Sequence, residues 1–332
     1  MRRLLCVCLT IATGLIAHIA NAKAYKGAEV YLNDNYLYGR YEMRMRVANA
    51  SGVLSTFFTY KSGSEIGNTF WEEIDIEVFG KNNATEWQSN VILGNSRPTI
   101  QTEQTHTHTS SLADAYHTYV LEWTPDYIAW YLDGVEVRRI TGTSTVTSLT
   151  SPQSPRFNIW ASESVPWVGA WDDSVLPVYQ FINYIEYKAY NTSTKNFEGG
   201  WRDDFNTLDS ARWSKASWSF DTNRVDFVPE NAVVKNGILV LALTTETATG
   251  YTGTPPADEP AQSSSASSVA VSSSAASSSI ALASSSAASS SVTASAGASS
   301  KANAGSNSGG GAVHFGWLLM LTSLLFIRSR KS

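Results

Sequence analysis

Three carboxylates occupy every second position of WEEIDIEVFG, residues 71–80 of the chain. Glu73, Asp75 and Glu77 alternate with isoleucine and valine, so a β-strand would put the acids on one face and the apolar side chains on the other. Neighbouring like charges on one face of a sheet repel each other. The pattern therefore favours a face that meets a ligand or performs a reaction, and the alternative is a solvated acidic face.

Paired carboxyl groups are what glycoside hydrolysis requires. One protonates the leaving oxygen while the other attacks the sugar or activates water, and retaining enzymes hold the two roughly 5–5.5 Å apart. The Cα atoms of Glu73 and Glu77 would lie about 13 Å apart on a flat strand, so this spacing requires converging side chains on a concave sheet. Asp75 can hydrogen-bond the attacking carboxylate, and its charge helps the acid to keep its proton. The spacing by itself does not decide which glutamate attacks.

Neighbouring segments repeat the arrangement of polar and aromatic side chains on one strand face. In SPRFNIW, Arg156, Asn158 and Trp160 alternate with apolar residues. Amides and charges beside aromatic rings suit a sugar, which offers both hydroxyl groups and apolar ring faces. The simpler alternative for each aromatic residue alone is core packing. The same-face sets in two other segments are Gln88 with Asn90, and Phe58 with Tyr60.

The elements that must position these residues are short strands. Alternating runs separated by turn signals recur between residues 25 and 246, without an internal repeat or a long helical pattern. In DYIAWYLDGVEVRRI, Asp133-Gly134 predicts a two-residue hairpin turn. Many short strands with this spacing predict an all-β sandwich or jelly roll.

The N-terminal residues have the layout of a secretory signal. A pair of arginines precedes an apolar run that ends in ANA. We therefore predict a signal peptide over residues 1–24, cut after Ala22 or Ala24, and an exported protein. The two cysteines of the chain, Cys6 and Cys8, lie within this segment, so the exported domain has no disulfide.

The C-terminal part differs in composition from the rest. Residues 247–308 are rich in Ser and Ala and predict a disordered linker. Residues 309–332 combine three glycines, an apolar run from Ala312 to Ile327 and the basic end RSRKS. This layout resembles the C-terminal sorting signals of exported Gram-negative proteins, and it also fits a plain transmembrane anchor with its basic end inside. Either alternative predicts at least transient contact with a membrane.

Charge and histidine usage exclude other classes of partner. The net charge is −5 and no basic run lies inside the folded part, which argues against nucleic acid. The histidines lack the spacing of a metalloprotease, and we expect His106 and His108 to be solvated in a Thr-rich loop. We expect a monomer that needs no cofactor for catalysis.

EIDIE within WEEIDIEVFGKN resembles the active-site strand of glycoside hydrolase family 16, in particular of its 1,3-1,4-β-glucanases, or lichenases. The resemblance extends through YGRYEMRMRVANASGVLSTFFTY, HTYVLEWTPDYIAWYLDG, RFNIWASESVPWVGAWDD and QFINYIEYKAY, so it covers nearly all of residues 25–246. It implies a concanavalin-like jelly roll in which Glu73 is the nucleophile, Asp75 the assisting carboxylate and Glu77 the acid/base. The laminarinase branch usually carries one more residue before the last glutamate, whereas this strand is regular.

One segment of the resemblance stands in an unusual place. DDFNTLDSARWSKASWSFDTNRVDF, which opens most of these glucanases, comes last here, at residues 203–227. The order is similar to that of the circularly permuted lichenases of the Fibrobacter type and predicts the same permutation, which adjacent termini allow. The resemblance also implies that the cleft is lined by Glu29, Phe58, Tyr60, Trp71, Gln88, Asn90, Arg156, Asn158, Trp160, Trp167, Trp201, Trp218, Asn223 and Arg224.

Members of this family commonly carry a structural calcium ion away from the catalytic face. The positions that match are Asn183, Asp204 and the backbone carbonyl of Gly237. Oxygen ligands suit calcium. The resemblance therefore implies a possible structural calcium with no part in the reaction.

The function that follows is endo-acting, retaining hydrolysis of β-1,4 bonds next to β-1,3 linkages in mixed-linkage β-glucan such as lichenan. One alternative is an endo-β-1,3-glucanase acting on laminarin, which product analysis would distinguish. Another is a non-catalytic, lectin-like glucan-binding module on the same fold. That alternative requires the acidic residues to be missing, and all three are present.

Overall fold

The computed structural model describes residues 22–95 and 98–258, which belong to one compact unit. Most of the predicted signal peptide, most of the predicted linker and the whole segment 309–332 lie outside the described residues. No helix in the described part of the chain is long and apolar enough to cross a membrane.

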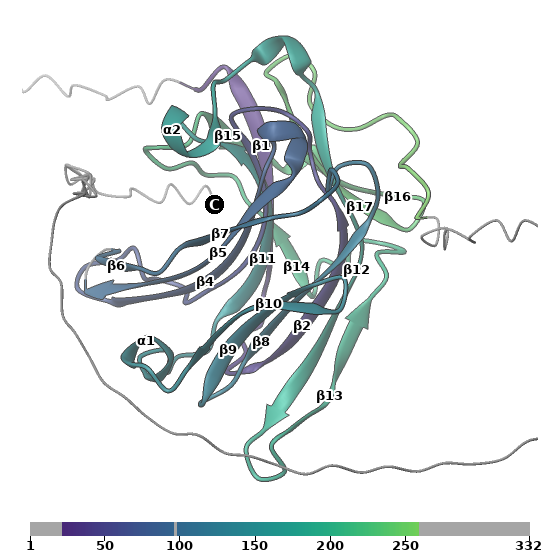
Figure 1. The fold of residues 1–332 in the computed structure, drawn as a ribbon. Helices are drawn as coiled ribbons and strands as arrows, with labels where there is room; N and C mark the ends of the chain where they lie inside the picture. The colour runs from purple at the N-terminus through teal and green to yellow at the C-terminus, as the bar shows by residue number, and fades with distance from the viewer. Residues whose placement is uncertain (1–21, 96–97, 259–332) are drawn as a thin grey trace, which may run out of the picture. The chain divides into compact units, whose positions relative to one another are not determined.

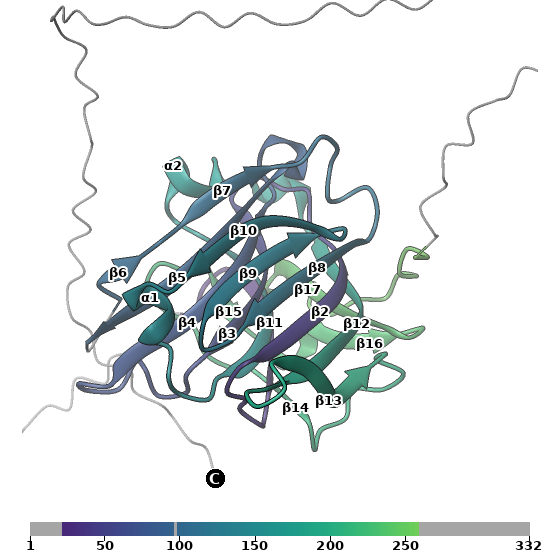
Figure 2. The ribbon, with the colours of Figure 1, turned by 60° about the horizontal axis from the view of Figure 1, so that its bottom comes forward.

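The strands form two layers (Figures 1 and 2). The first layer is antiparallel, in the order β14–β1–β11–β3–β4–β5, and both β6 and β7 pair with β5. Its strands are β1 (Tyr25–Leu32), β3 (Val53–Tyr60), β4 (Phe70–Phe79), β5 (Glu86–Asn95), β6 (Ile100–Gln101), β7 (Gln104–Thr107), β11 (Ser154–Ala161) and β14 (Trp213–Lys215).

The second layer has the order β10–β9–β8–β2–β12, and β12 also pairs with β13 and β17. Its strands are β2 (Gly39–Arg46), β8 (His117–Trp123), β9 (Tyr127–Leu132), β10 (Val135–Thr141), β12 (Val178–Asn191), β13 (Asn196–Asp203), β16 (Ala232–Lys235) and β17 (Ile238–Thr245). The short β15 (Val225–Phe227) pairs in parallel with β1.

Helical structure is limited to short pieces in the connections of the described chain. The α-helical turns are α1 (Ser144–Thr147) and α2 (Val165–Val168), and the 3₁₀ turns are η1 (Asn82–Ala84), η2 (Asp173–Val175) and η3 (Pro229–Asn231). The prediction of an all-β jelly-roll sandwich is confirmed.

The hydrophobic core lies between the two layers. Ile74 and Ile76 of β4 are fully buried, as the alternation of that strand predicts. Phe57 of the first layer meets Tyr41 of the second, with ring centroids 5.7 Å apart. The indole of Trp130, from β9, crosses the core and donates a hydrogen bond to the backbone oxygen of Asp75 over 3.0 Å. The inner face of β4 is therefore fixed by both packing and a buried hydrogen bond.

The hairpin predicted at Asp133-Gly134 joins β9 to β10. Both turn residues have positive φ, 49° for Asp133 and 81° for Gly134. A tight turn with this backbone matches the twist of paired strands, and glycine and aspartate accept positive φ more easily than other residues. The turn sets the register that places Leu132 opposite Val135.

The end of the folded unit returns to its beginning. Thr245 of β17 lies opposite Tyr25 of β1, and the amide of Glu246 donates to the carbonyl of Ala24 over 3.1 Å. Adjacent ends of this kind are what a circular permutation requires. The permutation itself stays a prediction.

The folded unit extends further than its predicted boundaries at both ends. Residues 247–258, predicted as linker, pack on the second layer: Tyr251 lies against Tyr179 at 4.7 Å, and Asp258 forms an ion pair with Arg44 at 2.8 Å. Lys23, predicted within the signal peptide, donates through its backbone nitrogen to Asp226 over 2.8 Å. Cleavage after Ala22 would keep this contact, whereas cleavage after Ala24 would remove it.

His106 differs from the expectation of a solvated loop residue. Its ring lies 4.4 Å from that of Trp87, and its Nε2 is 2.8 Å from the hydroxyl of Ser89. Burial lowers the pKa of His106 to about 4, so the imidazole is neutral at pH 7. The cause is the short strand β7, which pairs with β5 and brings the histidine onto the sheet.

Candidate active site

Strand β4 carries the three carboxylates on one face of the first layer. Its residues pair in unbroken register with β3 on one side and β5 on the other. Gln88 lies opposite Glu77, and Asn90 lies opposite Asp75. The strand is therefore regular, and Glu73 shares a face with the other two acids because side chains alternate along it.

Both glutamates accept a hydrogen bond from a neighbour that the sequence assigned to the cleft. The indole of Trp71 donates to Glu73 Oε2 over 2.6 Å. The amide of Gln88 donates to Glu77 Oε2 over 3.0 Å, and the indole of Trp167 donates to Gln88 Oε1 over 3.2 Å. Because Trp167 holds the amide oxygen, the Gln88 NH₂ group is directed at Glu77.

Asp75 lies between the two glutamates and is 3% exposed. Burial and then the charges of Glu73 and Glu77 raise the pKa of Asp75 well above its usual value. A hydrogen bond with Asp75 in turn lowers the pKa of Glu73. Asp75 therefore favours the Glu73 carboxylate, which is the assistance expected of it.

The pKa values of both glutamates are raised, with Glu77 the higher. Burial raises the pKa of Glu73 to about 7, against hydrogen bonds from Trp71 and Asp75 and the positive charge of Arg156. Burial and the negative charge of Glu73 raise the pKa of Glu77 to about 8. This order favours a carboxylate at position 73 and a protonated acid at position 77 near neutral pH, the pair that glycoside hydrolysis uses.

Arg156 on β11 brings positive charge to the Glu73 end of the site. It pairs with the buried Glu29 at 3.0 Å, and Asn158 donates to the other oxygen of Glu29 over 3.1 Å. The guanidinium carbon lies 4.7 Å from the ring centre of Tyr60, which stands opposite Glu73 on β3. The ion pair keeps the arginine in place, and the arginine in turn favours an anionic Glu73.

Aromatic and polar side chains lie at the Glu77 end. The ring of Trp160 is 5.8 Å from that of Trp167 and 5.1 Å from that of Phe220. Arg224 donates through Nε to the carbonyl of Ser162 over 3.1 Å. Asn223 is fully buried, and its side-chain oxygen accepts from a backbone amide over 3.0 Å. These contacts hold the connection between β14 and β15 beside the end of β11.

Comparison with known proteins agrees with the geometry. Residues 10–174 match the model of the glycosyl hydrolases family 16. Over 266 residues the chain is 43% identical to a beta-glucanase of Fibrobacter succinogenes, covering 77% of this chain and 75% of that protein. The chain belongs to glycosyl hydrolase family 16. A beta-glucanase of Acetivibrio thermocellus is 35% identical, and the alignment covers 49% of this chain and 46% of that protein.

Among solved structures, this family 16 enzyme is similar to the beta-glucanase of Bacillus licheniformis. The identity is 30%, the alignment covers 47% of this chain and 68% of that chain, and the TM-score is 0.40.

The family 16 chain has site neighbours that the sequence pattern did not reveal. The hydroxyl of Tyr60 donates to Glu65 over 2.6 Å. Glu65 lies in the β3–β4 loop, where no alternating pattern predicts which way a side chain points. Tyr31 lies between Arg156 and Trp218, 5.2 Å from the guanidinium carbon and 5.3 Å from the indole centre. Tyr31 is two residues from Glu29 on β1, so the alternation of side chains along that strand could have placed both residues on the same face.

A fourth acid of β4, Glu72, faces away from the three carboxylates of the candidate site. It is 1% exposed and accepts hydrogen bonds from Lys61 Nζ at 3.0 Å and from the backbone amides of Thr150 and Ser151 at 2.8 and 2.9 Å. The hydroxyl of Ser151 donates as well, over 2.6 Å, so four donors compensate this buried carboxylate for its lost hydration. Glu72 therefore ties two connections to the start of β4.

Trp201 is the predicted cleft residue that this family 16 structure places elsewhere. It lies on β13 of the second layer, whereas the carboxylates lie on β4 of the first. Its indole donates to the hydroxyl of Tyr36 over 3.0 Å, and its ring packs beside those of Tyr187 and Trp213. These contacts make Trp201 part of the packing at the edge of the core.

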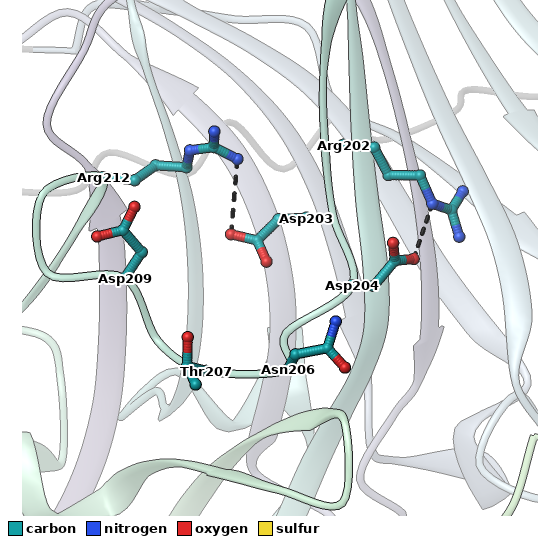
Figure 3. Close-up of a pocket in the computed structure, with 7 residues that line it drawn as sticks. All are labelled: Arg202, Asp203, Asp204, Asn206, Thr207, Asp209 and Arg212. Atoms are coloured by element: carbon teal, nitrogen blue, oxygen red, sulfur yellow. Dashed lines mark hydrogen bonds and ion pairs between the residues drawn. The ribbon is translucent and has the colours of Figure 1, made fainter.

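The residues matched to the family's calcium site lie on β12 (Asn183), just after β13 (Asp204) and in the β16–β17 turn (Gly237), and the two side chains among them have other partners. Asp204 is paired with Arg202 at 2.8 Å and lines a surface pocket (Figure 3). The amide nitrogen of Asn183 donates to Asp258 over 2.8 Å. The backbone oxygen of Asp204 lies 4.0 Å from where a Cβ on Gly237 would stand. One oxygen of the Asp204 carboxylate is engaged by Arg202, and calcium stays a prediction.

Proposed function

We propose that this family 16 enzyme is an endo-acting, retaining hydrolase of mixed-linkage β-glucan that cuts β-1,4 bonds next to β-1,3 linkages. The observation that carries the proposal is the unbroken register of β4, which places all three acids on one face of the strand. The names of the relatives, beta-glucanases of Fibrobacter succinogenes and Acetivibrio thermocellus, support the class of polymer.

The proposed reaction has two steps. In the first, the Glu73 carboxylate attacks the anomeric carbon while Glu77 gives its proton to the glycosidic oxygen, so the C–O bond breaks and a glycosyl ester forms on Glu73. In the second, the Glu77 carboxylate takes a proton from water, the water oxygen bonds to the same carbon and Glu73 leaves. Two inversions give net retention, and Glu77 ends protonated as it began.

The surroundings of β4 suit a polymer that passes through the site. Trp71 and Tyr60 meet edge to face, with centroids 5.4 Å apart, beside Glu73. The indoles of Trp160 and Trp167 lie towards Glu77, since Trp167 binds the Gln88 amide. Aromatic surfaces on both sides of the acids can hold sugar rings on both sides of the cleaved bond, as an endo-acting enzyme requires.

The linkage preference separates this proposal from an endo-β-1,3-glucanase. We expect the enzyme to release mainly tri- and tetrasaccharides from lichenan, at a rate at least tenfold higher than on laminarin at equal mass of polymer. Chromatography of the products and reducing-end assays measure both quantities. Faster attack on laminarin would contradict the mixed-linkage proposal and favour the β-1,3 alternative. Binding to lichenan without any product would favour the lectin-like alternative.

We also propose that the enzyme is exported and acts at the cell surface or in the medium, as the N-terminal layout and the polymeric substrate imply. Residues 309–332 then act either as a cleaved sorting signal or as a retained anchor. For the sorting signal we expect the mature C-terminus near the glycines at 309–311, measured by mass spectrometry of enzyme recovered from the cell surface or medium. An intact RSRKS end on that material would contradict sorting and favour the anchor.

A further inference from the structure

Three potential metal ligands come together outside the catalytic strand. His108 follows β7, His117 begins β8, and Asp133 is the first residue of the β9–β10 turn. One ligand atom from each of the three lies within 4.8 Å of the others. The sequence spacing of these residues matches no metal motif, because the hairpin and the β8–β9 pairing are what bring them together.

The carboxylate of Asp133 is already directed at an imidazole. Its Oδ2 lies 2.6 Å from His117 Nδ1, and its Oδ1 accepts the backbone amide of Thr118 over 2.8 Å. The tight turn fixes the aspartate backbone, and the amide fixes the orientation of the carboxylate. Both oxygens of Asp133 thus already have partners, so an ion bound by Asp133 and His117 Nδ1 would take the place of the proton between them.

His108 presents a nitrogen with a free lone pair to the same place. Ser110 surrounds the Nδ1 atom of His108: its carbonyl oxygen is 2.9 Å away, and its amide nitrogen and hydroxyl are both 3.3 Å away. Because these contacts occupy Nδ1, Nε2 is the nitrogen that His108 can offer to an ion.

The distance between the two imidazoles suits one shared ion. The ring centroids of His108 and His117 are 5.2 Å apart, with an angle of 72° between the rings. Two imidazoles bound to one tetrahedral zinc ion, with Zn–N bonds of about 2.0–2.1 Å, have centroids roughly 5 Å apart. Small side-chain rotations would therefore suffice to form the site.

Arg44 lies near the two histidines and Asp133, but it forms its ion pair with another acid. Arg44 donates to the hydroxyl of Thr118 over 3.2 Å, so it lies near Asp133. Its Nη2 and Nε, however, bind the carboxylate of Asp258 at 2.8 and 3.0 Å. The ion pair of Arg44 is therefore with Asp258.

We propose that His108, His117 and Asp133 bind a divalent transition-metal ion such as Zn²⁺, with water completing the coordination. Two imidazoles and a carboxylate are ligands that zinc accepts, whereas calcium and magnesium prefer oxygen alone. The ion would link the connection after β7, a strand of the first layer, to β8 and the β9–β10 turn of the second. Residues 22–258 contain no cysteine, so the ion would provide a cross-link between the layers that no disulfide provides.

Zinc titration of the full chain tests the site. The protein is purified without a polyhistidine tag, stripped with EDTA and titrated in competition with a chromophoric zinc chelator, and its Tm is measured with and without Zn²⁺. We expect one zinc ion per chain from this site and a higher Tm with Zn²⁺ but not with Mg²⁺. Absence of zinc binding would overturn the proposal and leave a plain histidine–aspartate hydrogen bond.

Variants distinguish zinc binding at this site from zinc binding by other histidines. We expect His108→Ala and His117→Ala each to weaken zinc binding at least tenfold and to remove the Tm increase. Asp133→Asn, which keeps an oxygen for the Thr118 amide, should weaken binding while the metal-free Tm stays close to that of the parent. The matched control is His106→Gln, because His106 is two residues from His108 but faces Trp87 and Ser89. Parent-like affinity in both alanine variants would overturn the assignment.

Discussion

Replacing Glu73 with alanine is expected to lower kcat/KM on lichenan by at least about 10³-fold, which corresponds to about 4 kcal/mol of transition-state stabilisation. The reason is that the proposed reaction has no second attacking carboxylate: burial and the neighbouring charges raise the pKa of Asp75, and Glu77 supplies the proton for the leaving group. Initial rates of reducing-sugar release measure the loss. The matched control is Glu198→Ala, an exposed glutamate of β13 in the other layer, which should keep the parent rate.

Added azide distinguishes loss of the nucleophile from loss of the fold. In Glu73→Ala the small anion can enter the vacated space and attack the anomeric carbon once, so an activated aryl glycoside should give a glycosyl azide of inverted configuration. Nuclear magnetic resonance of the product determines that configuration. An azide product of retained configuration would contradict the nucleophile assignment and place that role elsewhere.

The same substitution has a predicted effect on the pH dependence of stability. Burial raises the pKa of Glu73 from 4.5 to about 7, so the folded state holds a proton that the unfolded state releases. Stability attributable to this group is therefore present below about pH 4.5 and is lost as pH rises to about 7. Thermal unfolding between pH 4.5 and 7 should therefore show a smaller loss of stability in Glu73→Ala than in the parent.

Replacing Glu77 with alanine is expected to lower the rate on lichenan by about 10²–10⁴-fold, the usual contribution of a positioned general acid. The loss should be much smaller on an aryl glycoside whose leaving group needs no proton. Here azide should give a product of retained configuration, because the Glu73 ester still forms first. An equal loss on both substrates would contradict the role of Glu77 as the acid.

The pH profile of the parent enzyme tests the same roles of Glu73 as nucleophile and Glu77 as acid. Activity should fall as pH drops through about 7, when Glu73 gains a proton, and as pH rises through about 8, when Glu77 loses its proton. Because the two groups interact, these values describe the pair as a whole. Glu77→Ala should lack the alkaline fall on the activated substrate. An unchanged alkaline fall would show that another group causes it.

Periodicity along single strands was enough to predict the fold class and the strand face that carries the three carboxylates. Ile74 and Ile76 alternate with the acids of β4, and a two-residue period fixes which side chains meet the core whatever the neighbouring strands are. The turn at Asp133-Gly134 was predictable for a related reason, since few residue pairs adopt positive φ at two successive positions. These features depend on local backbone geometry, which the sequence encodes directly.

Only the tertiary structure decided which distant groups meet. Trp167 orients Gln88 towards Glu77 across 79 positions, Glu65 reaches Tyr60 from a loop, and Asp258 packs on Arg44 from a segment that composition assigned to the linker. Trp201 has an aromatic character that suited a cleft, yet its strand pairs in the other layer. Loops and long-range pairings have no period, so their contacts follow from packing and charge compensation once the layers have closed.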